Sequence, residues 1–178
     1  YKVTGVQTCA LPIYPLDLKE VVKSGGTEFT DRETLDRIIN YSGFPEPFLY
    51  ADKKFYNRWQ KSHLDVILRE DFLGLLNVKD ISKLRLLIEL LRERVGSPLS
   101  YSSLANDLHT SYKTIQSWVA LLEKLYIIFR VTPYSNNIAR SILKEPKYYF
   151  YNTAFVNGDE GVKFENLVGS EEHTSELQ

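Results

Sequence analysis

The side chains with the clearest chemical use lie on one face of a predicted helix that begins at Tyr112. Four polar side chains share this face at helical spacing: Lys113, Gln116, Ser117 and Lys124. Lys113, Gln116 and Ser117 would face base edges in the major groove of DNA, with Tyr112 alongside, and Lys124 would contact phosphates. A solvated face on an ordinary helical core has the same composition, so the spacing leaves both interpretations open.

The opposite face of this helix is apolar, which predicts that it packs inward. It consists of Ile115, Trp118, Val119, Leu122 and Leu125. A shorter predicted helix, 101–108, precedes it across a polar turn, and a β-rich run, 126–131, follows it. Two helices joined by a tight turn and followed by a strand predict a helix-turn-helix with a wing.

The predicted wing adds cations to the same surface. Arg130 lies in its first strand, and Arg140 lies in the loop and short helix before a return strand at 147–151. Together with Lys124, these side chains would contact phosphates. Residues 97–147 hold six cations against three carboxylates, whereas the whole chain has a net charge of −1. Any affinity for nucleic acid must therefore come from a local patch.

Three further amphipathic helices are expected before residue 101, and the third of them is the first helix of the winged-helix unit. Thr30 and Glu33 form a capping box that opens the first, which the Gly- and Pro-rich residues 42–47 are expected to end. Asp52 caps the second, and Asp80 opens the third. The expected inward faces are Leu35, Ile38 and Ile39, then Phe55, Trp59, Val66 and Ile67, then Leu84, Leu87, Ile88, Leu91 and Val95.

Several kinds of chemistry lack the residues they need. Cys9 is the only cysteine, which excludes a disulfide framework and a thiolate metal site. No GxxxxGK[ST] or GxGxxG run can hold a nucleotide, and GxSxG and HExxH are also absent. His63 is expected to pack beside its helix, because no second ligand stands at metal spacing. We therefore predict no catalytic residue, cofactor site or metal site in this segment.

Length and composition fit one or two small domains with real cores. The chain has 178 residues, of which 43% are hydrophobic. No window approaches the ~20 apolar residues of a membrane-spanning helix. We expect a cytoplasmic protein that does not contact membranes.

Both ends of the chain are predicted to be foreign. Residues 3–13 and 170–178 can be encoded by opposite strands of one oligonucleotide, which resembles a high-throughput sequencing adapter. The alternative is two unrelated native tails, which would not be expected to match in both orientations. We therefore predict adapter-derived tails at 1–13 and 170–178 and leave them out of the fold prediction.

Short motifs along the chain occur in an order shared with one family. They are Pro15–Glu20, Gly43–Glu46, Arg69–Asp71, Ser100 with Leu104–Ala105, Leu122–Glu123, Pro133–Tyr134, Pro146–Phe150 and Phe164–Val168. Together they resemble the C-terminal half of the predicted prokaryotic AAA+ ATPases, over essentially all of residues 14–169. In that family an ATPase core is followed by a lid, a winged helix and an uncharacterised domain that resembles restriction endonucleases.

The resemblance implies a lid-like helical segment at 14–72, a winged helix at 73–151 and the start of a truncated C-terminal domain at 152–169. It also implies that the nucleotide-binding segments lie upstream, in an intact parent that would use ATP and Mg²⁺. The family often carries Asp where Asn152 stands, and an amide is a poor substitute for an anionic metal ligand. Glu165 matches a helix Glu of the family, but one carboxylate does not make a nuclease site.

We therefore predict a mainly α (α+β) fold: a helical lid remnant, a winged helix-turn-helix and a truncated α/β element. The predicted function is that of a non-catalytic fragment of an AAA+ ATPase whose winged helix binds double-stranded DNA. The alternative is a winged helix that binds a protein partner and relays between lid and C-terminal domain. Nuclease chemistry is a third option. DNA binding and protein binding are distinguished by whether the face that carries Lys113 and Lys124 is open to solvent or buried against neighbouring elements.

Overall fold

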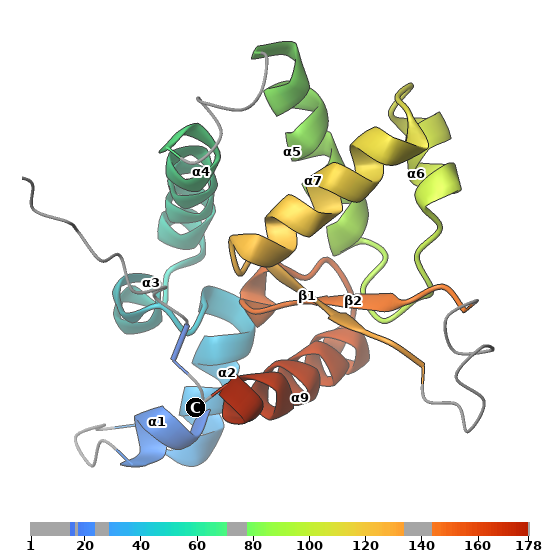
Figure 1. Ribbon diagram of the computed structural model, residues 1–178. Coiled ribbons are helices and arrows are strands. Elements are labelled where there is room, and N and C mark those ends of the chain that lie inside the picture. The colour runs from blue at the N-terminus through green and yellow to red at the C-terminus, as the bar shows by residue number, and fades with distance from the viewer. Residues whose placement is uncertain (1–14, 17, 24–28, 71–77, 134–143, 178) are drawn as a thin grey trace, which may run out of the picture.

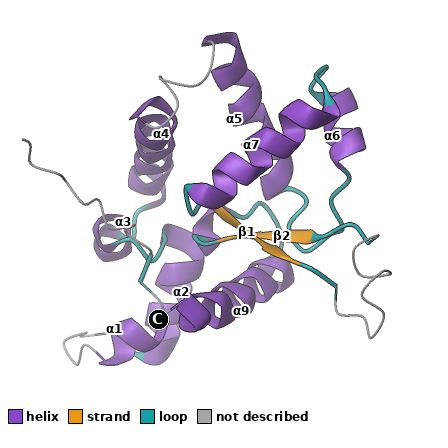
Figure 2. Cartoon of the chain, viewed as in Figure 1, coloured by secondary structure: helices purple, strands orange, loops and turns teal. Residues whose placement is uncertain are grey.

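The computed structural model describes residues 15–16, 18–23, 29–70, 78–133 and 144–177 (Figure 1). Most of these residues are helical, and the two strands among them pair in one sheet (Figure 2). The prediction of a mainly α fold with a small β component is confirmed.

The elements follow one another along the chain with the following bounds. They are α1 (Leu18–Lys23), α2 (Asp31–Tyr41), α3 (Pro45–Tyr50), α4 (Lys53–Glu70), α5 (Val78–Arg92), α6 (Tyr101–Asp107), α7 (Tyr112–Lys124), β1 (Ile128–Val131), β2 (Lys147–Phe150), the 3-10 helix η1 (Thr153–Phe155) and α9 (Glu160–Leu177).

Helices α5, α6 and α7 and the two strands follow the order predicted for a winged helix. The apolar stripe predicted for α5 is buried in full, from Leu84 to Val95. Helices α6 and α7 pack against each other, and β1 pairs with β2 in antiparallel register. In the connection between α5 and α6, Pro98 forms an isolated bridge to Lys147. That connection therefore lies along the outer edge of β2.

The boundaries of this unit differ from the predicted ones by a few residues. The first strand was expected from residue 126, but it begins at Ile128 because Tyr126 has a φ of 53°, which extended chain does not adopt. Helix α5 begins at Val78 rather than at Asp80. Gly96 has the positive φ expected of a cap, 73°, but lies beyond the end of the helix. Most of the predicted wing loop, 134–143, lies outside the described residues.

The small sheet lies between helices on both of its faces. Helix α7 packs against β1, and α9 packs against β2 (Figure 1). On the α9 side, the rings of Phe129 and Tyr149 stack with centroids 5.6 Å apart, and His173 stacks on Phe129 at 4.7 Å. Burying both faces of a two-stranded sheet gives it the packing that an isolated hairpin lacks.

Asn166 of α9 fastens that helix to the sheet. Its side chain is fully buried, and its Oδ1 accepts a hydrogen bond from the Phe150 backbone N–H at 2.8 Å. Its Nδ2 donates to the Phe150 carbonyl at 2.9 Å and to Thr153 Oγ1 at 2.9 Å. The amide thus satisfies both backbone groups of Phe150 as a neighbouring strand would.

A second, smaller core joins the first three helices to α9. Val21, Ile38, Phe48 and Leu167 are its buried members. The predicted capping box is present at the start of α2, since Thr30 and Glu33 each accept a hydrogen bond from the other's backbone N–H. The Pro-rich segment was expected only to end a helix, but it also begins α3, where proline needs no donor.

The predicted inward face of α4 is partly confirmed. The cap by Asp52 is present, because Oδ1 accepts the Phe55 N–H at 2.7 Å. Trp59 and Ile67 pack against the main core, and Phe55 is half-buried. Val66 was predicted to face inward, but it is 52% exposed, whereas Tyr56 and Leu68 are buried.

The structure describes only the second of the two segments predicted to derive from an adapter. Residues 1–13 lie outside the described residues. Helix α9 continues through Ser170, whose Oγ donates to the Leu167 carbonyl, and Glu171 accepts the Leu18 backbone N–H at 2.8 Å. The adapter origin of both tails stays a prediction.

We expect Asn166→Asp to destabilise the protein by roughly 3 kcal/mol or more at neutral pH, because a carboxylate cannot donate to Phe150 and Thr153 and is costly to bury. Chemical denaturation measures the free energy of unfolding. Asn157→Asp is the matched control: this side chain accepts a hydrogen bond from Arg92 and needs no donor, so a change within about 0.5 kcal/mol is expected. A loss below about 1 kcal/mol for Asn166→Asp would contradict the role of the amide.

Candidate nucleic-acid interface

The outer face of α7 is open to solvent. Lys113, Gln116, Ser117 and Lys124 are all exposed, and Tyr112 at the start of the helix is 51% exposed. None of the described elements covers this face. The α7 residues predicted to contact bases and phosphates therefore lie on one open face. Arg140, which was also predicted to contact phosphates, lies outside the described residues.

The inner face of α7 holds the helix in place. Ile115, Trp118, Val119 and Leu122 are buried as predicted, while Leu125 is half-buried just past the helix end. Ser111 caps the helix by accepting the Thr114 backbone N–H at 3.1 Å. Four buried apolar side chains and a cap fix which side chains of α7 point outward.

Hydrogen bonding within α7 limits what Ser117 can do. Its hydroxyl donates to the Lys113 backbone carbonyl at 2.9 Å. The oxygen lone pairs remain able to accept a hydrogen bond, for example from the amino group of adenine or cytosine in the major groove. Gln116 carries both a donor and an acceptor, the pairing that suits adenine.

Arg130 on β1 is paired within the protein. Its guanidinium Nε lies 3.7 Å from the carboxylate of Glu123 on α7, and 54% of its side chain is exposed. Burial raises the pKa of Glu123, and the nearby Arg130 charge opposes that effect. A phosphate at this position would therefore share Arg130 with a carboxylate that is only partly solvated.

Three tyrosines support the starts of α6 and α7. The hydroxyl groups of Tyr101 and Tyr148 are hydrogen-bonded to each other, and the ring of Tyr112 lies 5.7 Å from that of Tyr101. Burial raises the pKa of both Tyr101 and Tyr148. The sequence analysis assigned no role to Tyr101 or Tyr148, because their partnership joins residues that are far apart in the chain.

The turn between α6 and α7 is anchored to α5. Lys83 donates to the His109 backbone carbonyl at 3.0 Å, and Arg94 binds the Asp107 carboxylate at 2.8 Å. His109 has a φ of 47°, so the carbonyl that accepts the hydrogen bond from Lys83 belongs to a residue in the left-handed region. Asp107 at the end of α6 is paired with Arg94.

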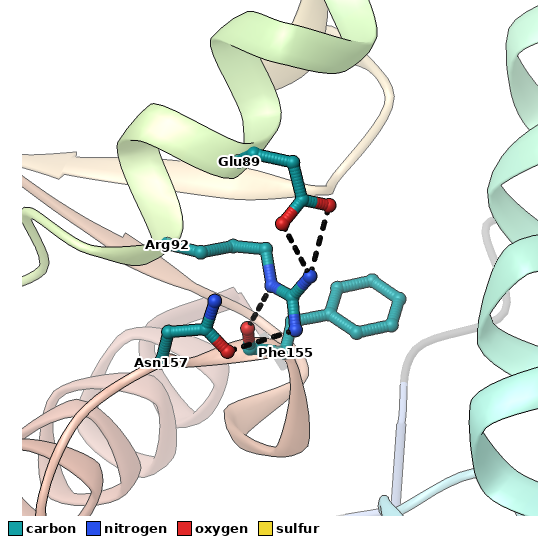
Figure 3. A network of polar contacts seen from close by, with 4 residues as sticks. All are labelled: Glu89, Arg92, Phe155 and Asn157. Carbon is teal, nitrogen blue, oxygen red and sulfur yellow. Dashed lines mark hydrogen bonds and ion pairs between the residues drawn. The ribbon is translucent and has the colours of Figure 1, made fainter.

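A second polar network links α5 to η1 (Figure 3). Arg92 is mostly buried, and it donates to the Phe155 carbonyl and, at 3.0 Å, to the Asn157 side chain. Glu89 accepts from the same guanidinium through both carboxylate oxygens, at 2.9 and 2.7 Å. The five-donor fork of arginine is thus used to tie the segment after β2 to the helix-turn-helix. Only the i, i+3 spacing of Glu89 and Arg92 was visible in the sequence.

The residues considered for nuclease chemistry do not form a metal site among the described residues. Asn152 is buried and caps η1 by accepting the Ala154 backbone N–H. Glu165 instead accepts the Tyr149 hydroxyl at 2.7 Å and lies 3.4 Å from the Lys147 ammonium. Within the described ranges, no group of three or more His, Cys, Asp and Glu side chains could hold a metal ion.

His63 packs as the sequence predicted. Its ring stacks on Trp59 with centroids 4.5 Å apart and contacts Phe44 at 4.8 Å. Burial lowers the pKa of this histidine, as expected for an imidazole held among apolar rings.

Comparison with known proteins assigns a family but no activity. A family model described as "Domain of unknown function (DUF8612)" matches residues 32–163. An uncharacterized protein of Haemophilus influenzae is 24% identical over 170 residues, covering 89% of this chain and 42% of the relative. The chain therefore spans less than half of that relative's length. No solved structure matches. Across the described residues, no helix has the length and apolar character needed to span a membrane.

Alkaline pH should destabilise the fold through its buried tyrosines. Burial raises the pKa of Tyr148 above its ordinary value near 10 and that of Tyr151 to about 12. The unfolded chain loses these protons first, so stability is full below about pH 10 and falls as pH rises from there. Chemical denaturation at a series of pH values measures how steeply the free energy of unfolding falls with pH. The fall should be less steep for Tyr148→Phe than for Tyr50→Phe, because the Tyr50 side chain is 67% exposed. Equal slopes for the two variants would contradict the role of Tyr148.

Proposed function

The chain belongs to the DUF8612 family, and we propose that residues 78–150 form a winged-helix module that binds duplex DNA. The observation that supports this most is the open outer face of α7, with its two lysines and an amide held outward by a buried apolar face. A helix presented in this way fits the major groove, whose width admits one α-helix.

Each side chain of this surface has a proposed contact. Gln116 and Ser117 would read base edges together with Lys113, and Tyr112 would lie alongside them. Lys124 and Arg130 would contact phosphates, and Arg140 would extend those contacts along the wing. A DNA-binding role would place the protein in the cytoplasm.

We also propose that this chain is part of a longer ATPase. The ordered motifs that resemble the C-terminal half of predicted prokaryotic AAA+ ATPases support this, as does a relative of more than twice the matched length. In that protein the nucleotide-binding segments would lie upstream and would bind ATP and Mg²⁺. The present chain would supply the lid-like helices and the winged helix, and would not itself be catalytic.

A protein-binding relay is the second candidate. The Arg92 network supports it, because α5 is bonded directly to the segment that leads from β2 into α9. The lid-like helices also reach this segment directly, because α2 packs against η1 and α9. On this alternative, the α7 face would bind a protein partner rather than DNA.

Neutralising the α7 face should weaken DNA binding in a salt-dependent way. For Lys113→Gln with Lys124→Gln, we expect the slope of log affinity against log salt to fall by about 0.9, because Lys124 is the member of the pair assigned to a phosphate and each phosphate contact contributes about 0.9. Fluorescence anisotropy with a labelled random-sequence duplex measures it. Arg32→Gln on α2, also exposed, is the control and should leave the slope unchanged. Absence of affinity for duplex DNA even at low salt would eliminate the proposal and favour the relay.

The ATPase proposal is tested on the complete protein. We expect its full reading frame to encode a GxxxxGK[ST] loop upstream and the purified protein to hydrolyse ATP only with Mg²⁺. Replacing the loop lysine with alanine should abolish turnover. A complete frame without a phosphate loop, or turnover that survives the lysine change, would overturn the proposal.

A further inference from the structure

Helix α4 carries a stripe of cations on its solvent face. Lys54, Arg58 and Lys61 stand at i, i+4 and i+7, so they align along one side of the helix, and all three are exposed. By the rise of an α-helix, the stripe is about 10 Å long. We name these three residues the α4 stripe.

The stripe itself contains no acid, since residues 53–64 have no Asp or Glu. Asp65 follows Lys61 at i+4 on the same side of the helix, but its carboxylate binds Arg85 at 2.8 Å. Asp52 precedes the stripe and caps the helix through the Phe55 N–H. Both flanking carboxylates therefore have a partner outside the stripe.

A further pair of cations adds to the positive potential at the start of α4. Lys163 of α9 donates to Asn40 at 3.4 Å, and its pKa is lowered first by burial and then by the charge of Lys53. The charge of Lys53 therefore acts on the neighbouring helix, where the carboxylates of Glu160 and Asp36 act on Lys163 in the opposite direction.

We infer that the α4 stripe binds the phosphate backbone of duplex DNA, as a second contact surface apart from α7. This inference rests on the proposed function only in taking DNA as the polyanion. A length of about 10 Å corresponds to about three base-pair steps measured along the duplex axis, because each strand carries one phosphate per about 3.4 Å of axis. Flexible lysine and arginine side chains bind phosphates without reading sequence, so the surface adds affinity rather than specificity.

The composition of the α4 face favours a duplex backbone over other polyanions. Single-stranded nucleic acid binds on exposed aromatic platforms, but the rings of α4 are engaged by other rings: Phe55 stacks on Tyr50, which is 67% exposed, and Trp59 stacks on His63. A protein interface requires an apolar centre, and the exposed residues of 53–62 are all polar. Within this range, a row of cations matches a regular row of phosphates.

The test compares three variants by anisotropy titration with the same random-sequence duplex over a range of salt concentrations. Lys54→Gln, Arg58→Gln and Lys61→Gln combined should lower the slope of log affinity against log salt by about 2–3. Arg58→Gln alone should lower it by about 0.9, whereas Arg32→Gln, an exposed arginine on α2, should leave it unchanged. Circular dichroism and thermal unfolding confirm that the triple variant is folded.

The outcomes separate this inference from the proposed function. An unchanged slope for the triple variant, with a reduced slope for Lys113→Gln and Lys124→Gln, overturns the α4 contact and leaves the α7 proposal standing. The reverse result supports the α4 contact and overturns the α7 proposal. If poly-L-glutamate competes as well as unlabelled duplex at equal charge, and the triple change removes that competition, the stripe binds acidic protein and the inference is wrong.

Discussion

The structure depends on one buried amide. Asn166 bonds to both backbone groups of Phe150, and through this contact the last helix takes the place of a third strand beside β2. Further along the same edge, Gly96 donates to the Tyr148 carbonyl and Leu99 to the Pro146 carbonyl. A strand paired on one side only would expose unsatisfied groups, and these three contacts close that edge.

The sheet belongs to an apolar core that it shares with helices from different parts of the chain. One apolar cluster extends from Tyr56 of α4, through α5 and α7, to Val156 beyond η1. The outward faces of α4 and α7 therefore belong to helices that share one apolar core.

Periodic features were predictable from the sequence, and features that join distant residues were not. The inner face of α7 and the stripe of α5 follow from helical spacing, and the start of α2 follows from its capping box. The Arg92 to Phe155 contact joins residues 63 apart, so no local pattern reveals it. Val66 was misplaced for a related reason: packing against other helices, rather than the helix's own composition, decides which way a broad apolar face turns.

The pairing of Arg130 with Glu123 has a consequence for selectivity among anions. A guanidinium that already has an internal carboxylate gains little from a lone chloride or free phosphate, since the exchange replaces one pairing with another. A polymeric ligand anchored through neighbouring lysines presents its next phosphate at a high effective concentration and can displace the carboxylate. Glu123 therefore competes with any anion for Arg130, and this competition is weak because the pair is separated by 3.7 Å and Arg130 is 54% exposed.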